Sequence, residues 1–182
     1  MAPIFCDILV AGGSAGGTAA ALAAAAAGAS VCLLEETEWL GGQLTVQGVC
    51  TPDENRYIES FGCTRRYAIF RNAVRDHYRS EYKLSAVGAA QPFLNPGSCW
   101  VSGLSFEPKV GAMVLAELVR PNMESGNLRI FYQSQVVECG TSVERPDRID
   151  TVIARRRDGQ ELCFRPQFVG SSPSSVLHAA VD

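Results

Sequence analysis

The stretch Val10-Ala11-Gly12-Gly13-Ser14-Ala15-Gly16-Gly17 decides the fold of this chain. The apolar run from Asp7 to Ala11 leads into it and is typical of a buried parallel strand. Alanine fills eight of the nine positions 19–27, which predicts a helix over about 15–27. The glycine cluster therefore lies in a turn between a strand and a helix.

The next residues predict a second strand beside the first. Gly28 is placed to end the helix in the left-handed conformation. Ser30 to Leu34 (SVCLL) is short and apolar, as a buried strand is, and Glu35 closes it. Residues 5–36 therefore predict a right-handed strand–helix–strand unit with two parallel strands.

A glycine turn in such a unit is the usual binding site for a dinucleotide pyrophosphate. Its first glycine permits the reversal of the chain, its second lets the backbone approach the phosphates, and its third lets helix and strand pack closely. Read as G-x-G-x-x-G, these positions are Gly12, Ser14 and Gly17. The register shifted by one loses the first glycine, because position 11 is Ala. We therefore expect Gly17, not Gly16, to lie against the strand.

Glu35 follows the glycine turn at the distance where a ribose-binding acid is expected. A carboxylate there accepts hydrogen bonds from ribose hydroxyls and disfavours a 2′-phosphate. The ligand is thus expected to resemble adenosine diphosphate rather than NADP. A phosphate-binding loop of the nucleotide-hydrolase type needs a Lys-Ser/Thr pair after the glycines, and Thr18-Ala19 does not supply one. The plainer alternative is a small-residue turn that only allows tight packing.

Composition limits the function classes further. The chain has 182 residues, 47% of them hydrophobic, and a formal net charge of −3. These values predict a domain with an apolar core and argue against a disordered polyelectrolyte or a nucleic-acid binder. No Lys or Arg precedes Arg56. Any anion bound by the first quarter must therefore be held by backbone amides and the positive end of a helix dipole.

The compartment is expected to be the cytoplasm. The N-terminus has no basic segment, Asp7 stands where the apolar run begins, and glycines interrupt that run, so neither a signal peptide nor a membrane span is expected. The seven cysteines show no C-x-x-C pair and no metal-ligand spacing. We expect reduced, mostly structural thiols, no metal site and no membrane partner.

The middle of the chain predicts helices. Apolar residues recur at helical spacing over Arg65–Tyr82, and the arginines between them are expected to form a solvated face. Pro108 can open a second helix that runs to about Arg120, where Pro121 is expected to stop it. We expect a helical and loop insertion over about 53–125.

The last third predicts strands. Leu128 to Val137 reads as one strand, and Ile149–Arg156 and Glu161–Phe168 flank Asp158-Gly159, which is a strong hairpin signal. Residues 126–169 are therefore expected to complete a domain spanning 1–169. Residues 170–182 have weak periodicity and are interpreted as a tail.

The run Glu35–Gln47, EETEWLGGQLTVQ, resembles the FAD-dependent oxidoreductase family that groups near the FAD subunit of heterodisulfide reductase. In that family an aromatic-Leu-Gly-Gly-x-Leu-Thr loop follows the ribose-binding acid. Further stretches that resemble the family are DENRYIE at 53–59, PFLNPG at 92–97, CWV at 99–101 and FEP at 106–108. The resemblance covers about 5–169 and favours FAD over NAD.

The resemblance implies an α/β, Rossmann-like FAD-binding domain of the two-dinucleotide-binding type, with a helical insertion and a β-hairpin. It implies that the flavin carries electrons or a hydride while the protein binds and tunes it. The residues that it places along the cofactor are Gly12, Gly13, Ser14, Ala15, Gly16 and Gly17 at the pyrophosphate, Glu35 at the ribose, Glu36, Gly41, Gly42 and Gln43 along the adenosine and pyrophosphate, and Val137 at the adenine.

Two departures from the family pattern create further expectations. Ser14 replaces the usual glycine, which is expected to weaken FAD binding without abolishing it. After Phe168-Val169 the family continues into an Asp-Ala-Thr-x-x-Gly-Asp type motif that residues 170–182 do not match. The chain is therefore interpreted as an incomplete, C-terminally truncated member. A catalytically incompetent nucleotide-binding fragment and an NAD-binding module remain as alternatives.

No catalytic residue, substrate or oligomeric state can be assigned from the sequence. Asp53, Glu54 and Arg56 are compatible with an acid/base cluster and equally with a loop-stabilising ion pair. Cys99, beside Trp100, is interpreted as a structural thiol rather than a redox partner of the flavin.

Overall fold

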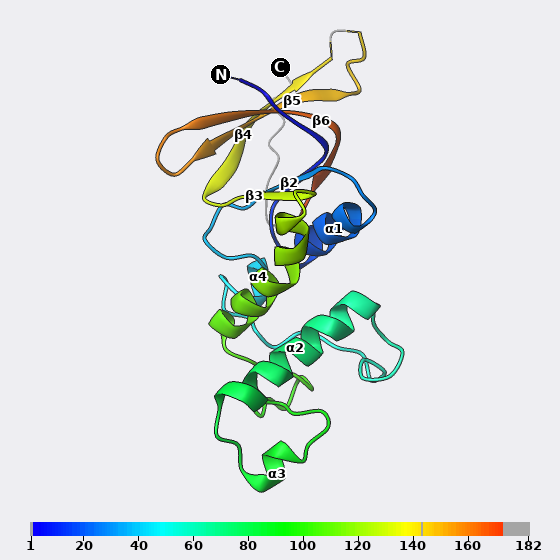
Figure 1. Ribbon diagram of the computed structural model, residues 1–182, viewed down its shortest axis with the longest axis vertical. Helices are drawn as coiled ribbons and strands as arrows, with labels where there is room; N and C mark the ends of the chain where they lie inside the picture. The colour runs from blue at the N-terminus through cyan, green and yellow to red at the C-terminus, as the bar shows by residue number, and fades with distance from the viewer. Residues whose placement is uncertain (1, 143, 173–182) are drawn as a thin grey trace. The chain divides into compact units, whose positions relative to one another are not determined.

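The computed structural model describes residues 2–142 and 144–172 (Figure 1). Its chain divides into two compact units, which are described separately below. Unit 1 comprises Met1–Gly42 and Val119–Asp182, and unit 2 comprises Gln43–Leu118. The strand–helix–strand unit and the hairpin belong to unit 1, while the middle of the chain forms unit 2.

A six-stranded mixed sheet organises unit 1, in the order β3-β2-β1-β6-β5-β4 (Figure 1). The strands are β1 (Ile4–Ala11), β2 (Val31–Leu34), β3 (Leu128–Phe131), β4 (Ser134–Thr141), β5 (Ile149–Arg156) and β6 (Glu161–Ser171). Four neighbouring strands, β3, β2, β1 and β6, run parallel, and β4–β5–β6 form an antiparallel meander. This is the mixed α/β, Rossmann-like architecture that the sequence predicts, and its hairpin is confirmed.

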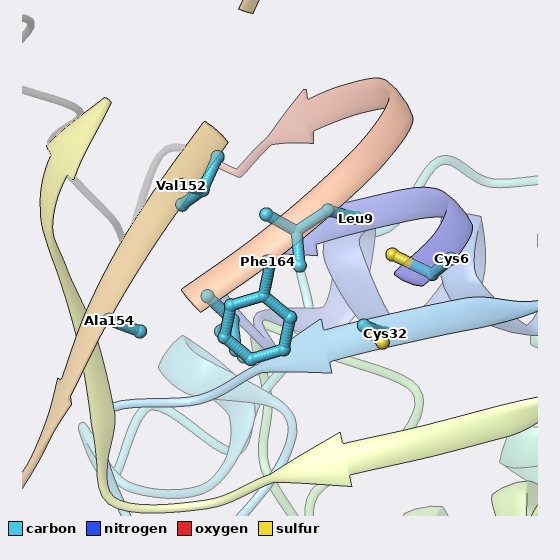
Figure 2. Close-up of a cluster of buried hydrophobic side chains, with 7 residues drawn as sticks. Cys6, Leu9, Cys32, Val152, Ala154 and Phe164 are labelled. Carbon is cyan, nitrogen blue, oxygen red and sulfur yellow. The ribbon is translucent and has the colours of Figure 1, made fainter. Parts of the chain in front are cut away.

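β6 joins the two halves of the sheet. Its residue Phe164 pairs with Val152 of β5 on one side and with Ile4 of β1 on the other. The Phe164 side chain is fully buried and meets the Phe131 ring edge-on at 5.0 Å between centroids. Figure 2 shows it at the centre of an apolar cluster, between Leu9 and the β5 residues. Burial of these apolar side chains stabilises the part of the sheet where β1, β2, β5 and β6 meet.

The helix α1 (Ala15–Ala26) packs on β1, β2 and β3. Its buried positions recur three or four residues apart and are Gly17, Thr18, Ala21, Leu22 and Ala25. Such small side chains form a thin layer that lets the helix lie close to the sheet. Gly28 has a φ of 91°, so it adopts the left-handed conformation expected after this helix.

Unit 2 is built on α2 (Arg65–Glu81), the short α3 (Ala86–Ala89) and the first part of α4 (Pro108–Glu124). A single turn of 3-10 helix, η1 (Gly42–Leu44), stands at its N-terminal boundary. Phe70 of α2 meets Phe106 edge-on at 5.8 Å between ring centroids, and both side chains are buried. The helix expected over 65–82 is confirmed.

Three expectations about element boundaries are wrong. The single strand expected over Leu128–Val137 is two strands, because Gln133 adopts a φ of 52° and turns the chain between β3 and β4. Pro121 lies inside α4 instead of ending it. Its ring removes only one hydrogen bond this close to the C-terminal end, and Gly126, with a φ of 79°, follows the helix.

The third correction concerns the end of the hairpin. β6 continues through Gly170 and Ser171, which pair with Val10 and Ala11 of β1. These two residues therefore belong to the sheet and not to a tail. Residues 173–182 lie outside the described part of the chain.

Candidate dinucleotide-binding site

The glycine turn follows β1 at the carboxyl edge of the parallel strands. Gly12 has a φ of 98° and donates its amide to Leu34 O of β2 at 3.0 Å. A methyl group on Gly17 would lie 1.9 Å from the carbonyl oxygen of Gly12. No side chain fits there, so Gly17 is the glycine that allows helix and strand to pack closely. This agrees with the register that begins at Gly12.

Gly16 is exposed and lies next to open space. A Cβ atom at this position would meet only Ser14 Oγ, at 3.8 Å. No acceptor faces the Gly16 amide among the described residues, and the amide belongs to the first turn of α1. Free amides at the positive end of a helix form an anion site. The turn thus offers a phosphate a backbone donor and the space to reach it.

Glu35 stands directly after β2 and is 6% exposed. Its Oε2 accepts a hydrogen bond from the Gly13 amide at 2.9 Å, and its Oε1 accepts from Thr37 N at 2.8 Å and Thr37 Oγ1 at 2.6 Å. A carboxylate has about four acceptor directions, so about one remains on Oε2. That direction suits one donor hydroxyl, such as a ribose hydroxyl, and leaves the existing contacts in place.

The loop after Glu35 closes over the glycine turn. Gly41 donates its amide to Gly13 O at 2.7 Å. A methyl group on Gly42 would lie 3.1 Å from Ser14 Cα, and one on Gly13 would lie 2.7 Å from a Leu40 methyl carbon. The Leu-Gly-Gly sequence of this loop therefore lets its backbone lie in contact with the glycine turn.

Val137 lies three residues into β4, in a β-bulge. The pairing of β4 with β5 skips it between Val136 and Glu138, and its side chain is 39% exposed. The start of β4 lies beside Glu35, because Ser134 donates its amide to Glu35 O at 2.9 Å. A backbone segment outside a regular ladder can pair with the edge of a base.

The other residues expected along the cofactor are Ala15, Glu36 and Gln43. Ala15 is the exposed first residue of α1. Glu36 is exposed too, and the partial loss of water around its carboxyl group, together with the charge of Glu35, raises the pKa of that group. Gln43 lies in η1 and belongs to unit 2. The structure therefore brings together Gly12–Gly17, Glu35, Gly41, Gly42 and the start of β4.

Four residues that support this site were not singled out from the sequence. Thr18 is buried and donates its hydroxyl to Gly13 O at 3.0 Å. Thr37 holds Glu35, and Leu40 closes on Gly13. Ser172 donates its amide to Ala11 O at 2.8 Å and its hydroxyl shares a hydrogen bond with that of Ser14. Of these four residues, only Thr37 could have been recognised from the sequence, because a hydroxyl two residues after an acid at a strand end can hydrogen-bond to that acid.

Within unit 2, two arginines of α2 are not part of a solvated face, which corrects the expectation for them, whereas Arg65, Arg66 and Arg79 are exposed as expected. Arg71 and Arg75 are both 1% exposed. Arg71 forms ion pairs with Glu54 and Glu59, and Arg75 binds Glu59 and Leu94 O. Burial of a charge requires such partners, and two nearby loops supply them.

The possible acid/base cluster at Asp53, Glu54 and Arg56 is not assembled as one group. Glu54 pairs with Arg71 and accepts the Gly103 amide at 3.1 Å, so it joins two loops to α2. Arg56 stacks on the Tyr57 ring at 4.5 Å, and Asp53 is exposed. The loop-stabilising interpretation holds for Glu54, with a partner different from Arg56.

All seven cysteines lie in the described part of the chain and are free thiols. Cys99 is half-buried, and its amide donates to Ser105 Oγ at 3.4 Å, while the neighbouring Trp100 is 94% exposed. Within the described residues, no group of three or more His, Cys, Asp or Glu side chains is arranged to hold a metal ion.

The family model described as FAD dependent oxidoreductase matches residues 7–181. The chain therefore belongs to the FAD-dependent oxidoreductase family, and its cofactor is FAD. The match extends past the 5–169 that the resemblance in sequence covered. No curated protein matches the chain.

Solved structures share the fold at low sequence identity. The myxobacterial chondrochloren halogenase CndH, an FAD-dependent halogenase, has a TM-score of 0.54 at 18% identity over 93% of this chain and 37% of its own. Mycobacterium smegmatis Sdh1 in complex with UQ1 has a TM-score of 0.55 at 14% identity, over 94% of this chain and 34% of its own. The E. coli quinol fumarate reductase FrdA has a TM-score of 0.50 at 13% identity, over 94% of this chain and 33% of its own. The chain thus spans about a third of the length of these structures.

Among the described residues, no helix has both the length and the apolar character needed to cross a membrane.

Proposed function

We propose that the chain is the FAD-binding part of an oxidoreductase, and that it binds the cofactor pyrophosphate at the glycine turn and the adenosine ribose at Glu35. When bound, the flavin would supply electron or hydride transfer, and the protein would orient it.

The observation that carries this proposal is the fit of the turn to a phosphate. Gly17 closes the side of the turn that faces the strand, and Gly16 leaves open space beside an amide that has no acceptor among the described residues. No cationic side chain occurs in residues 1–55, so the backbone and the dipole of α1 carry the anion.

The ribose part of the proposal rests on Glu35. Its buried carboxylate keeps one acceptor direction on Oε2, which a ribose hydroxyl can fill. A 2′-phosphate would bring negative charge against it and would find no cationic side chain in this part of the sequence. FAD, NAD and ADP therefore remain compatible, whereas NADP does not.

The narrower relationship that we propose is to flavoenzymes near the FAD subunit of heterodisulfide reductase, and its support is the loop Trp39–Thr45. We also propose that this chain corresponds to the N-terminal portion of a longer enzyme of that kind. The support is the share of about a third that it covers in the similar structures.

The direct test is to titrate the purified chain with FAD, ADP, NAD and NADP by calorimetry and to record the visible spectrum of the protein as isolated. We expect FAD and ADP to bind, NADP to bind at least about ten-fold more weakly than NAD, and a flavin spectrum to appear with FAD. Binding of NAD but not FAD would instead identify an NAD-binding module. Binding of none of the four would identify an incompetent fragment and overturn the proposal.

A further inference from the structure

Ser172, directly after β6, forms two hydrogen bonds at the glycine turn and lies close to Gly17. Its amide donates to Ala11 O at 2.8 Å. Its Cβ lies 3.3 Å from the position that a Gly17 methyl group would take, and its hydroxyl shares a hydrogen bond with the Ser14 hydroxyl. The two serines are 158 residues apart in sequence. The end of the sheet therefore contacts the position where this chain departs from the glycine pattern.

The hydroxyl of Ser14 also caps α1, because its Oγ accepts a hydrogen bond from the Gly17 amide at 3.2 Å. A serine hydroxyl has one proton to donate and two lone pairs that accept. If Ser172 donates to Ser14, the Gly17 amide and the Ser172 hydroxyl fill both lone pairs. The proton of Ser14 must then point elsewhere.

The surroundings show where that proton can point. Ser172 is 4% exposed, whereas Ser14 is only partly buried. The open side of the turn lies next to Ser14, at Gly16. An anion placed there would meet the Gly16 amide, which has no acceptor among the described residues, and could accept the outward proton of Ser14 as well. A hydrogen bond from a hydroxyl to a phosphate oxygen is charge-assisted and stronger than one between neutral groups.

We propose that Ser172 is a positioning residue for the cofactor pyrophosphate: its hydroxyl donates to Ser14 and so directs the Ser14 proton toward a phosphate oxygen. This inference rests on the proposed function. In this arrangement Ser14 does more than tolerate the loss of a glycine, since its hydroxyl supplies a donor that glycine lacks. The Ser14→Gly variant, which the sequence alone predicts to bind FAD more tightly, is here expected to gain no affinity.

The opposite direction of donation leads to a different result. If Ser14 donates to Ser172, the Ser14 proton is used within the protein and the hydroxyl can offer a phosphate only its lone pairs. Removal of the Ser172 hydroxyl would then free that proton and leave FAD affinity equal or higher. The two directions therefore predict changes of opposite sign for one substitution.

The test measures FAD and ADP dissociation constants by calorimetry for the wild-type chain and for Ser14→Ala, Ser172→Ala, Ser172→Thr and the Ser14→Ala/Ser172→Ala double variant. We expect about ten-fold weaker binding for Ser14→Ala and about three- to ten-fold weaker binding for Ser172→Ala. Ser172→Thr keeps the hydroxyl and should bind within about two-fold of wild type. The double variant should bind no more weakly than Ser14→Ala, since Ser172 acts through Ser14.

A matched control is Ser125→Ala, which removes an exposed hydroxyl that bonds only within its own turn. Unfolding midpoints without cofactor separate a loss of fold from a loss of binding. If Ser172→Ala does not fold, Ser172→Cys takes its place, because it keeps the size and weakens the donor. Wild-type affinity in the folded Ser172 variant, or additive losses in the double variant, would overturn the inference. Failure of the wild-type chain to bind FAD and ADP would instead overturn the proposed function.

Discussion

Gly17 and Gly12 lie in such close contact that a methyl group on Gly17 would stand 1.9 Å from the Gly12 carbonyl oxygen. That oxygen belongs to the backbone of the turn and cannot rotate away. We expect Gly17→Ala to lower the free energy of unfolding by at least about 3 kcal/mol, measured by urea denaturation. Gly16→Ala is the matched control, because its Cβ would meet open space and alanine favours a helix. It should leave stability unchanged or raise it by up to about 1 kcal/mol. Equal effects of the two substitutions would contradict this account of the turn.

Glu35 should be sensitive to the loss of one oxygen. Glu35→Gln keeps the shape of the side chain but turns one acceptor into a donor, which then faces the amide of Gly13 or the backbone and hydroxyl donors of Thr37. A buried donor left against another donor costs about 1–3 kcal/mol, so the urea midpoint should fall. FAD affinity should fall as well, which calorimetry measures.

The control for that substitution is Glu124→Gln at the end of α4. Its carboxylate is exposed and pairs with Arg120 at 3.5 Å, so its loss should change stability by no more than about 0.5 kcal/mol and leave FAD affinity unchanged. A stable Glu35→Gln chain with unchanged affinity would separate this acid from the cofactor site.

Asp7 should make stability depend on pH in the acid range. Hydrogen bonds from the Ser30 amide at 2.8 Å and from its hydroxyl at 3.0 Å lower the pKa of the Asp7 carboxyl group. The ionised form of the Asp7 carboxyl group is therefore more strongly favoured in the folded chain than in the unfolded chain. This contribution is fully present above the ordinary aspartate pKa and is lost as pH falls through the lowered one.

Thermal melts between neutral and strongly acid pH check this relationship. Asp7→Asn should be less stable than wild type at neutral pH, and the difference should shrink as the pH falls below the usual aspartate range. Asp53→Asn, which alters an exposed carboxylate, should follow the wild-type curve. A difference between Asp7→Asn and wild type that stays constant with pH would refute the role of the Asp7 charge.

Arg75 should be important for the stability of unit 2. Its guanidinium is buried and donates to Leu94 O at 2.9 Å and to Glu59 Oε2 at 3.0 Å. Arg75→Met fills a similar volume but leaves a buried carbonyl and part of a carboxylate without a donor. We expect a loss of about 3 kcal/mol in the free energy of unfolding. Arg66→Met, on the exposed side of the same helix, should change it by less than about 0.5 kcal/mol. Similar losses from both would mean that the ion pairs of Arg75 add little.

Much of unit 1 could be predicted from the sequence, because the residues that determine its strands, helix and turns are close together in the chain. The glycine turn, the alanine helix and the strand before Glu35 are each encoded within a few residues, and the structure shows all three. The hairpin at Asp158-Gly159 was visible for the same reason, since this dipeptide sets the turn. Periodicity alone placed α2 correctly.

The parts that were wrong depend on contacts between distant residues. Leu128–Val137 has apolar residues at both ends and no glycine or proline that would predict a break. The turn at Gln133 is seen only in the structure, where β3 pairs with β2 and β4 pairs with β5. The burial of Arg71 and Arg75 depends on Glu54 and Glu59, which helical periodicity does not connect to α2. Ser172 was missed because its neighbour in space, Ser14, is 158 residues away.

The pairing of β6 with β1 has a consequence for the order of folding. The glycine turn is encoded near the N-terminus, but the strand that completes one side of it, β6, ends only at Ser171. During synthesis the turn and α1 leave the ribosome long before this neighbour exists. Contacts of such large sequence separation form slowly, since a long loop must close first. We therefore expect β1 to be a transiently exposed strand edge in the nascent chain, and chaperone binding to this edge would protect it until β6 arrives.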